Sequence, residues 1–137
     1  MGIPIKNLDG TFSVSIRSGM DQAIKNLDVI TDAKLRNCIR NRLEKSGKIL
    51  IRRNPSTDKV HSNSDDCYKN SESLGQHKTF LIIHSKKITL CIENIIDMGY
   101  GNDVWQIILH EFAHSCGWSH GDEKGVPGQH GFERRVN

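Results

Sequence analysis

Two histidines and a glutamate near the C-terminal end of the chain have the types and spacing of a metal site. His110 and His114 are four residues apart in an apolar stretch with the periodicity of a helix. Four residues advance about 400° around a helix, so both imidazoles leave the same face and can bind one tetrahedral zinc ion. Glu111 lies beside the first histidine. Its carboxylate can accept a proton from a zinc-bound water and return it to a leaving amine.

A glycine and a third histidine complete this pattern. Gly117 follows His114 at the point where a left-handed glycine can end the helix and reverse the chain. His120 can then return as a third ligand, which leaves the fourth position for water, as in catalytic zinc sites. Chance occurrence of all five positions is on the order of 10⁻⁴ per sequence. Buried imidazoles on one face would be poorly satisfied without a metal, which favours zinc binding over histidines that only pack on a helix. Glu111 beside the metal favours catalysis over a zinc site without catalysis.

The segment His110-Glu111-x-x-His114-x-x-Gly117-x-x-His120 resembles the extended zinc motif of the metzincin metallopeptidases. The resemblance implies that His110, His114 and His120 bind zinc and that Glu111 is the general base. It also implies a zincin-like fold, in which the active-site helix packs under a small twisted sheet. An extended substrate would pair with the edge strand of that sheet, here expected at Lys87–Glu93.

The resemblance covers 11 of the 137 residues, plus a plausible order of helix, strands and active-site helix. Metzincins carry a methionine-containing turn after the third ligand, whereas the methionines of this chain are Met1, Met20 and Met98, all before the motif. Only 17 residues follow His120. The expectation is therefore a minimal zincin-like hydrolase with a metzincin-type motif. Its small frame also resembles the metallopeptidase toxin domains at the C-terminal ends of bacterial secreted effectors.

Length and composition fit one soluble domain. The 137 residues carry a net charge of +3, too balanced for a nucleic-acid-binding protein, and no apolar run approaches the roughly 20 residues of a membrane span. Basic residues are densest between Lys34 and Arg53, where helical spacing favours a solvated helix face over an anion-binding or partner-binding patch. The N-terminus has no signal-peptide pattern, which leaves localisation open, with a secreted or delivered effector slightly favoured over a cytoplasmic protein.

Hydrophobic periodicity predicts the elements that must position the motif. A buried helix is expected from Val104 to about Cys116, capped by Asp103. Helical spacing runs from Met20 to about Lys45, as one broken helix or two, with Thr31 or Asp32 as a cap and Gly47 as the end. A strand is expected at Thr11–Ile16, before a break at Gly19. Further strands are expected at Lys48–Arg52, Thr79–His84 and Lys87–Glu93. Ser85-Lys86 is the expected hairpin turn, and residues 54–77 are expected to form a long loop.

These elements predict one α+β domain over residues 1–137, a minimal zincin-like domain. A small twisted mixed sheet is expected to pack on the N-terminal helix or helices and on the buried active-site helix. Four cysteines, none in a CxxC pair, permit two disulfides in any of three connectivities or four buried thiols. They are Cys38, Cys67, Cys91 and Cys116.

The function expected from these features is zinc-dependent hydrolysis of a protein or peptide substrate, in a secreted toxin or effector domain. Two alternatives stay open: a zinc amidase acting on peptidoglycan, and a non-catalytic zinc-bearing domain bound by an inhibitor or immunity protein. Among other residues, His130 is either a transition-state stabiliser or a surface histidine. Asp122 or Glu133 could hold a ligand imidazole through its second nitrogen.

Overall fold

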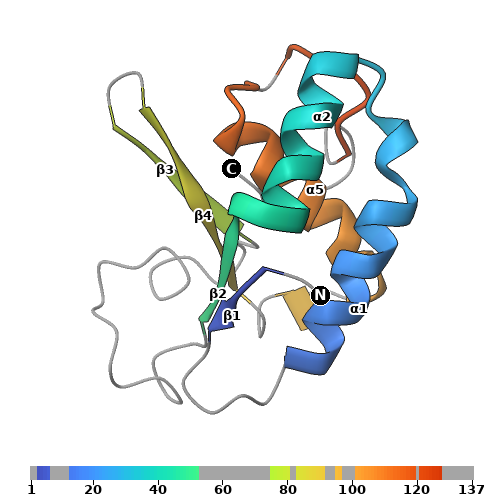
Figure 1. Cartoon of the computed structure of the whole chain (residues 1–137). Helices are drawn as coiled ribbons and strands as arrows, with labels where there is room; N and C mark the ends of the chain where they lie inside the picture. The colour runs from blue at the N-terminus through green and yellow to red at the C-terminus, as the bar shows by residue number, and fades with distance from the viewer. Residues whose placement is uncertain are drawn as a thin grey trace.

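The computed structural model describes residues 3–6, 13–52, 75–80, 83–91, 95–96, 101–119 and 121–127. In this part of the chain a four-stranded sheet lies to one side of a buried helix, and two further helices pack on that helix (Figure 1). The helices are α1 (Ser13–Lys25), α2 (Ala33–Asn41) and α5 (Val104–Ser115). Short helical turns are η1 (Leu27–Val29), η2 (Arg42–Ser46) and η3 (Gly101–Asp103).

Helix α1 replaces the strand predicted at Thr11–Ile16, and that prediction is wrong from Ser13 onward. The six-residue alternation is a chance feature of a longer amphipathic pattern, in which Ile16, Met20 and Ala23 are all buried at helical spacing. Gly19 does not break the chain. A Cβ at Gly19 would lie 2.9 Å from Val104 Cγ1, so the glycine lets α1 approach α5 closely.

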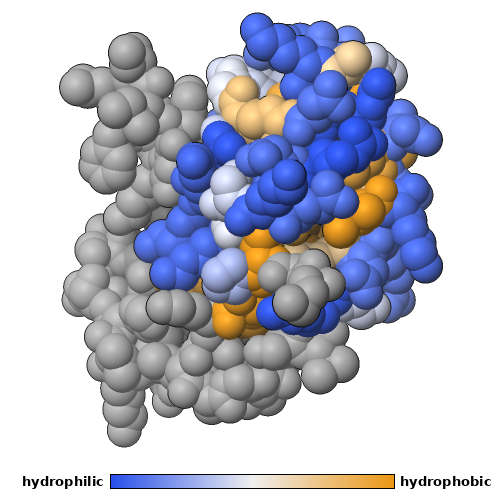
Figure 2. All heavy atoms as spheres, viewed as in Figure 1, coloured by the Kyte–Doolittle hydropathy of each residue, from blue (hydrophilic) through white to orange (hydrophobic). Residues whose placement is uncertain are grey.

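Helix α2 begins and ends where the sequence indicates. The Asp32 carboxylate accepts a hydrogen bond from the Leu35 amide at 2.8 Å, a side-chain N-cap. The helix continues as the π-helical turn η2, which ends at Gly47. The buried side chains are Leu35, Ile39 and Leu43, whereas Lys34, Arg40 and Lys45 are exposed. Hydrophilic side chains accordingly dominate the visible surface over α1 and α2 (Figure 2), which fits a solvated basic helix face.

The sheet has the order β1-β2-β4-β3 and is mixed. Strands β1 (Ile5–Lys6), β2 (Lys48–Arg52) and β4 (Ile83–Cys91) are parallel, and β3 (Gly75–Phe80) pairs antiparallel with β4. The strand prediction for Lys48–Arg52 is confirmed.

The second half of the sheet differs from prediction in register and order. The predicted turn at Ser85-Lys86 is wrong: Phe80 pairs with Ile83, and Ser85 and Lys86 both lie within β4. The apolar run 80–83 has none of the usual turn residues, so the local pattern does not show where β3 ends. The strand around Lys87–Glu93 is not an edge: β4 lies between β2 and β3, and the edge strands of the described sheet are β1 and β3. The predicted loop 54–77 is wrong at its last three residues, which belong to β3; positions 54–74 lie outside the described residues.

Helix α5 lies between the sheet and the other two helices, as its sequence predicts. It contacts β3 and β4 on one side and α1 and α2 on the other. Every residue from Ile107 to Ser115 is buried, polar ones included. Asp103 occupies the N-cap position, but its side chain makes no cap hydrogen bond.

The described part of the chain therefore has the predicted mixed α+β class, with a small mixed sheet. None of its helices is long and apolar enough to cross a membrane.

Candidate metal centre

Helix α5 ends in a Schellman turn centred on the motif glycine. Gly117 has φ 94°. The Trp118 amide donates to the Ala113 carbonyl and the Gly117 amide to the His114 carbonyl, each at 3.0 Å. These two bonds satisfy carbonyls that the end of a helix otherwise leaves unpaired. The turn directs the chain back toward the histidine-bearing face of α5, as the sequence pattern predicts.

The two described motif histidines lie together on that face. The ring centroids of His110 and His114 are 4.9 Å apart, with an interplanar angle of 78°. Bonds of about 2.0–2.1 Å from two imidazoles to one tetrahedral ion place the ring centroids roughly 5 Å apart. The separation of the two rings therefore suits a shared zinc ion.

Backbone carbonyls fix the tautomer of both rings. His110 Nδ1 lies 2.7 Å from the Pro127 carbonyl oxygen, and His114 Nδ1 lies 2.9 Å from that of Trp118. A carbonyl oxygen only accepts hydrogen bonds, so each Nδ1 must be the protonated donor. In the neutral rings the lone pair is then on Nε2, the state that a metal ligand requires. The donor set therefore fits a divalent metal such as zinc.

Trp118 packs against both imidazoles. Its indole centroid lies 5.1 Å from that of His110 and 5.0 Å from that of His114. The indole Nε1 donates to the Glu123 carbonyl at 3.1 Å. Trp118 is 3% exposed, so it closes one side of the histidine pair from solvent.

A left-handed turn follows the motif. Glu123, Lys124 and Gly125 have φ values of 59°, 57° and 78°. Left-handed geometry costs roughly 1–2 kcal/mol for each non-glycine residue, so other contacts must stabilise this turn. The Thr31 amide donates to the Lys124 carbonyl at 2.8 Å, and Gly125 packs so tightly on Val29 that a Cβ would collide with the Val29 carbonyl oxygen.

Glu111 is completely buried on α5, beside His110. A buried carboxylate is costly unless opposite charge or hydrogen bonds compensate it. A divalent cation held by the neighbouring imidazoles would supply such charge. A buried carboxylate next to a metal ligand is also the usual position of a general base in zinc hydrolases.

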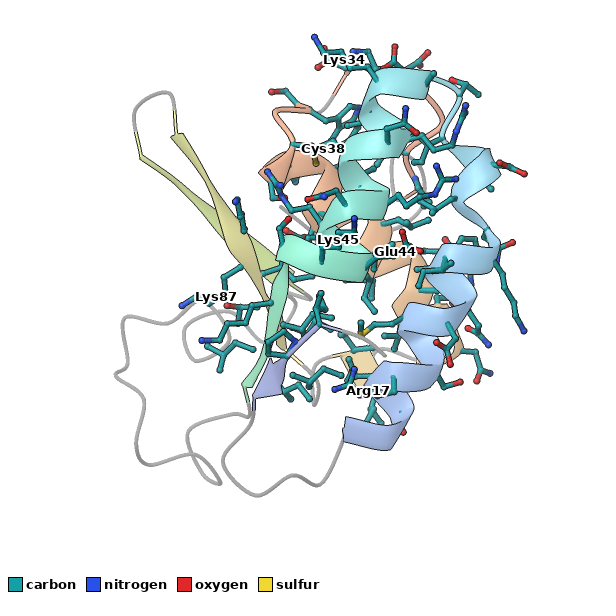
Figure 3. The ribbon with its side chains drawn as sticks, viewed as in Figure 1. Arg17, Lys34, Cys38, Glu44, Lys45 and Lys87 are labelled. Atoms are coloured by element: carbon teal, nitrogen blue, oxygen red, sulfur yellow. A yellow bond between two sulfur atoms is a disulfide. The ribbon has the colours of Figure 1, made fainter. Side chains whose placement is uncertain are left out.

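The C-terminal end of α5 is anchored to α2 and η2. Cys38 on α2 forms a disulfide with Cys116, the C-cap of α5, and Figure 3 shows Cys38 on the side of α2 that faces α5. Arg42 Nε and Nη2 donate to the hydroxyl and the carbonyl of Ser115 at 3.0 and 3.2 Å. Burial lowers the pKa of Arg42, and these bonds offset that desolvation. Of the two sequence alternatives for these cysteines, the structure has the disulfide.

Of the other predicted site residues, only Asp122 lies within the described part of the chain. His120, His130 and Glu133 lie outside the described residues. Within the described ranges, no three His, Cys, Asp or Glu side chains form a metal-binding group. The Asp122 carboxylate accepts from the Ser119 amide at 3.1 Å, whereas the His110 and His114 imidazoles are held by main-chain carbonyls.

Sequence reasoning missed Trp118, Pro127 and the turn between them. Trp118 could have been found, because it is a tryptophan inside the motif. Pro127 acts through its main-chain carbonyl, which every residue has, so no feature of the sequence indicates it. No protein family, curated protein or solved structure matches the chain.

Proposed function

We propose that this chain is a zinc-dependent metallopeptidase with a minimal zincin-like fold. One observation carries the proposal: the His110 and His114 rings lie together on α5, and each Nδ1 is held by a carbonyl oxygen, which puts the lone pair of each neutral ring on Nε2, the proposed ligand atom. His120 is the proposed third ligand, from the motif spacing alone. The buried Glu111 beside this pair favours a catalytic over a structural metal.

A zinc ion held by these histidines would polarise a substrate carbonyl and make a water molecule more acidic. The Glu111 carboxylate takes a proton from the attacking water and passes it to the amine that leaves. Burial of Glu111 helps this transfer, because few competing solvent molecules reach the carboxylate. His114 and His110 keep their orientation through the reaction, since their carbonyl partners belong to the folded main chain.

The proposed substrate is an extended peptide. Strand β3 is one edge of the described sheet and contacts α5, so a peptide paired with its outer side would run beside the motif helix. Main-chain pairing of this kind selects the extended shape of a peptide more than its sequence. A peptidoglycan amide bond could be hydrolysed with the same metal chemistry, and a substrate panel separates the two.

The direct test is Glu111→Gln, with Glu44→Gln as the matched control. Glu44 is an exposed carboxylate on η2. Zinc content is measured together with the hydrolysis of casein-type peptides and of cell-wall fragments. We expect Glu111→Gln to keep one zinc per chain and to lose roughly 10²- to 10⁴-fold in peptide hydrolysis, as for loss of a general base, and Glu44→Gln to match the wild type.

Other outcomes of this test contradict parts of the proposal. Full activity in Glu111→Gln would mean that Glu111 is not the base. Cleavage of cell-wall fragments without cleavage of peptides would favour the amidase. No hydrolysis by zinc-loaded wild type would favour a non-catalytic interaction domain.

A further inference from the structure

The two motif imidazoles are held by different parts of the chain. The carbonyl partner of His114 belongs to Trp118, four residues along the chain in the same Schellman turn. The partner of His110 belongs to Pro127, 17 residues along the chain. The orientation of His114 is therefore a local property of the end of α5. The orientation of His110 depends on where the segment after the motif is placed.

The left-handed turn Glu123–Gly125 places that segment. It comes directly before Val126 and Pro127, and the Val126 amide donates back to the Glu123 carbonyl at 3.1 Å. Val126 is 3% exposed, so its side chain is part of the core. The position of the Pro127 carbonyl is thus tied to the position of Glu123.

The Trp118 indole also contacts the Glu123–Gly125 turn. Its Nε1 donates to the Glu123 carbonyl, and its ring packs edge-on against His110 at 5.1 Å with an interplanar angle of 76°. One side chain therefore contacts both the imidazole and the turn that carries the carbonyl partner of that imidazole. On the far side, the Lys124 carbonyl accepts from the Thr31 amide, so the turn is held from two directions.

We propose that Trp118 is a positioning residue for His110, acting through the Glu123–Gly125 turn and the Pro127 carbonyl. This inference rests on the proposed function, because the orientation that it fixes is that of a metal ligand. Second partners of metal-binding histidines commonly set the tautomer and contribute about 10- to 100-fold to metal affinity. Here the second partner of His110 is the Pro127 carbonyl, and its position depends on Trp118, an aromatic side chain within the motif.

The first experiment reads the histidine tautomers in the zinc-free protein by long-range ¹⁵N–¹H NMR, in the wild type, Trp118→Phe and Trp105→Phe. Trp105 is a half-buried tryptophan on the same helix and serves as the matched control. In the wild type both rings are expected as the Nδ1–H tautomer. In Trp118→Phe, His110 is expected to lose its single tautomer while His114 keeps it, because the main-chain carbonyl of residue 118 remains.

Zinc affinity, measured by competition with a chelator, is the second readout. Trp118→Phe is expected to weaken it by roughly 10-fold or more, and Trp105→Phe to leave it unchanged. The proposal is overturned if His110 and the zinc affinity are the same in Trp118→Phe as in the wild type. It is also overturned if both histidines change together, since that pattern reports a general loss of structure.

Gly125→Ala is a second route, which leaves Trp118 intact. Its Cβ would meet the Val29 carbonyl, so the turn must shift, and the same loss of tautomer at His110 alone is expected. If neither variant folds, the NMR measurement on the wild type still tests the proposal, because a mixed or Nε2–H tautomer of His110 in the wild type overturns it. A wild type that binds no zinc but keeps the tautomer pattern would instead contradict the proposed function.

Discussion

At the scale of single residues, Arg42 connects the helical layer to the end of the motif helix. Its guanidinium donates to both the hydroxyl and the carbonyl of Ser115, which directly follows His114. The Ser115 hydroxyl in turn donates to the Phe112 carbonyl at 3.0 Å. A cation at this position also interacts favourably with the negative end of the helix dipole.

Replacement of Arg42 by lysine is expected to destabilise the fold. A lysine keeps the charge but lacks the planar fork that reaches both oxygens of Ser115. Arg42→Lys is expected to lower the free energy of unfolding by about 1–2 kcal/mol. Arg40→Lys is the matched control, because Arg40 is exposed and, among the described residues, bonds only the exposed Asn37; a loss below about 0.5 kcal/mol is expected there. Equal losses in urea denaturation would contradict a special role for Arg42.

How much of the candidate site could be predicted from the sequence depends on the type of contact. The spacing of His110 and His114 placed both rings on one buried face, and Gly117 was read as the helix stop, as the structure has them. The partners of the two rings were sought among Asp122 and Glu133. They are carbonyls, and any residue carries a carbonyl, so only the folded chain reveals which one is near.

At the scale of elements, the Cys38–Cys116 disulfide joins α2 to the end of α5. It links positions 78 residues apart in the sequence. Both cysteines, with Trp118 and Lys124, line an open pocket of about 330 Å³. We therefore expect a small reductant to reach the bond in the folded protein.

Loss of this disulfide is expected to cost about 4 kcal/mol, the chain-entropy value for a loop of this length. The double variant Cys38→Ser/Cys116→Ser should therefore unfold at a clearly lower temperature than the wild type, and a dithiol should lower the wild-type value similarly. The dithiol is also tested on the double variant, so that any effect through Cys67 and Cys91 is measured separately. Equal melting temperatures for oxidised wild type and double variant would contradict a structural role for the bond.

Elements with clear apolar and capping patterns were predictable, and elements without them were not. Helix α5, strand β2, the Asp32 cap of α2 and the end of η2 at Gly47 follow from apolar patterns and capping. The alternation at Thr11–Ile16 spans too few residues to distinguish a strand from one face of α1. The sequence around the end of β3 contains none of the usual turn residues, so its position was not predictable. Strand order depends on tertiary pairing, which the local pattern does not encode.

At the scale of the whole molecule, the fold surrounds one helix. The sheet covers one side of α5, while α1 and α2 cover another. Such burial fixes the backbone that carries His110, Glu111 and His114. The elements around α5 pack closely on it because Gly19 and Gly47 have no Cβ at the points of contact. A site on such a helix is preorganised, and the chain segment after it supplies the remaining contacts.

The central claim is that this helix carries a three-histidine zinc site, and metal stoichiometry with affinity tests it most directly. Purified wild type is expected to bind one zinc per chain, and Co²⁺ substitution to give the visible spectrum of a tetrahedral nitrogen-rich site. His110→Ala, His114→Ala and His120→Ala should each weaken zinc binding by at least roughly 100-fold, more than loss of an outer partner. Zinc binding that is absent in the wild type, or unchanged in any one of the three variants, would contradict the claim.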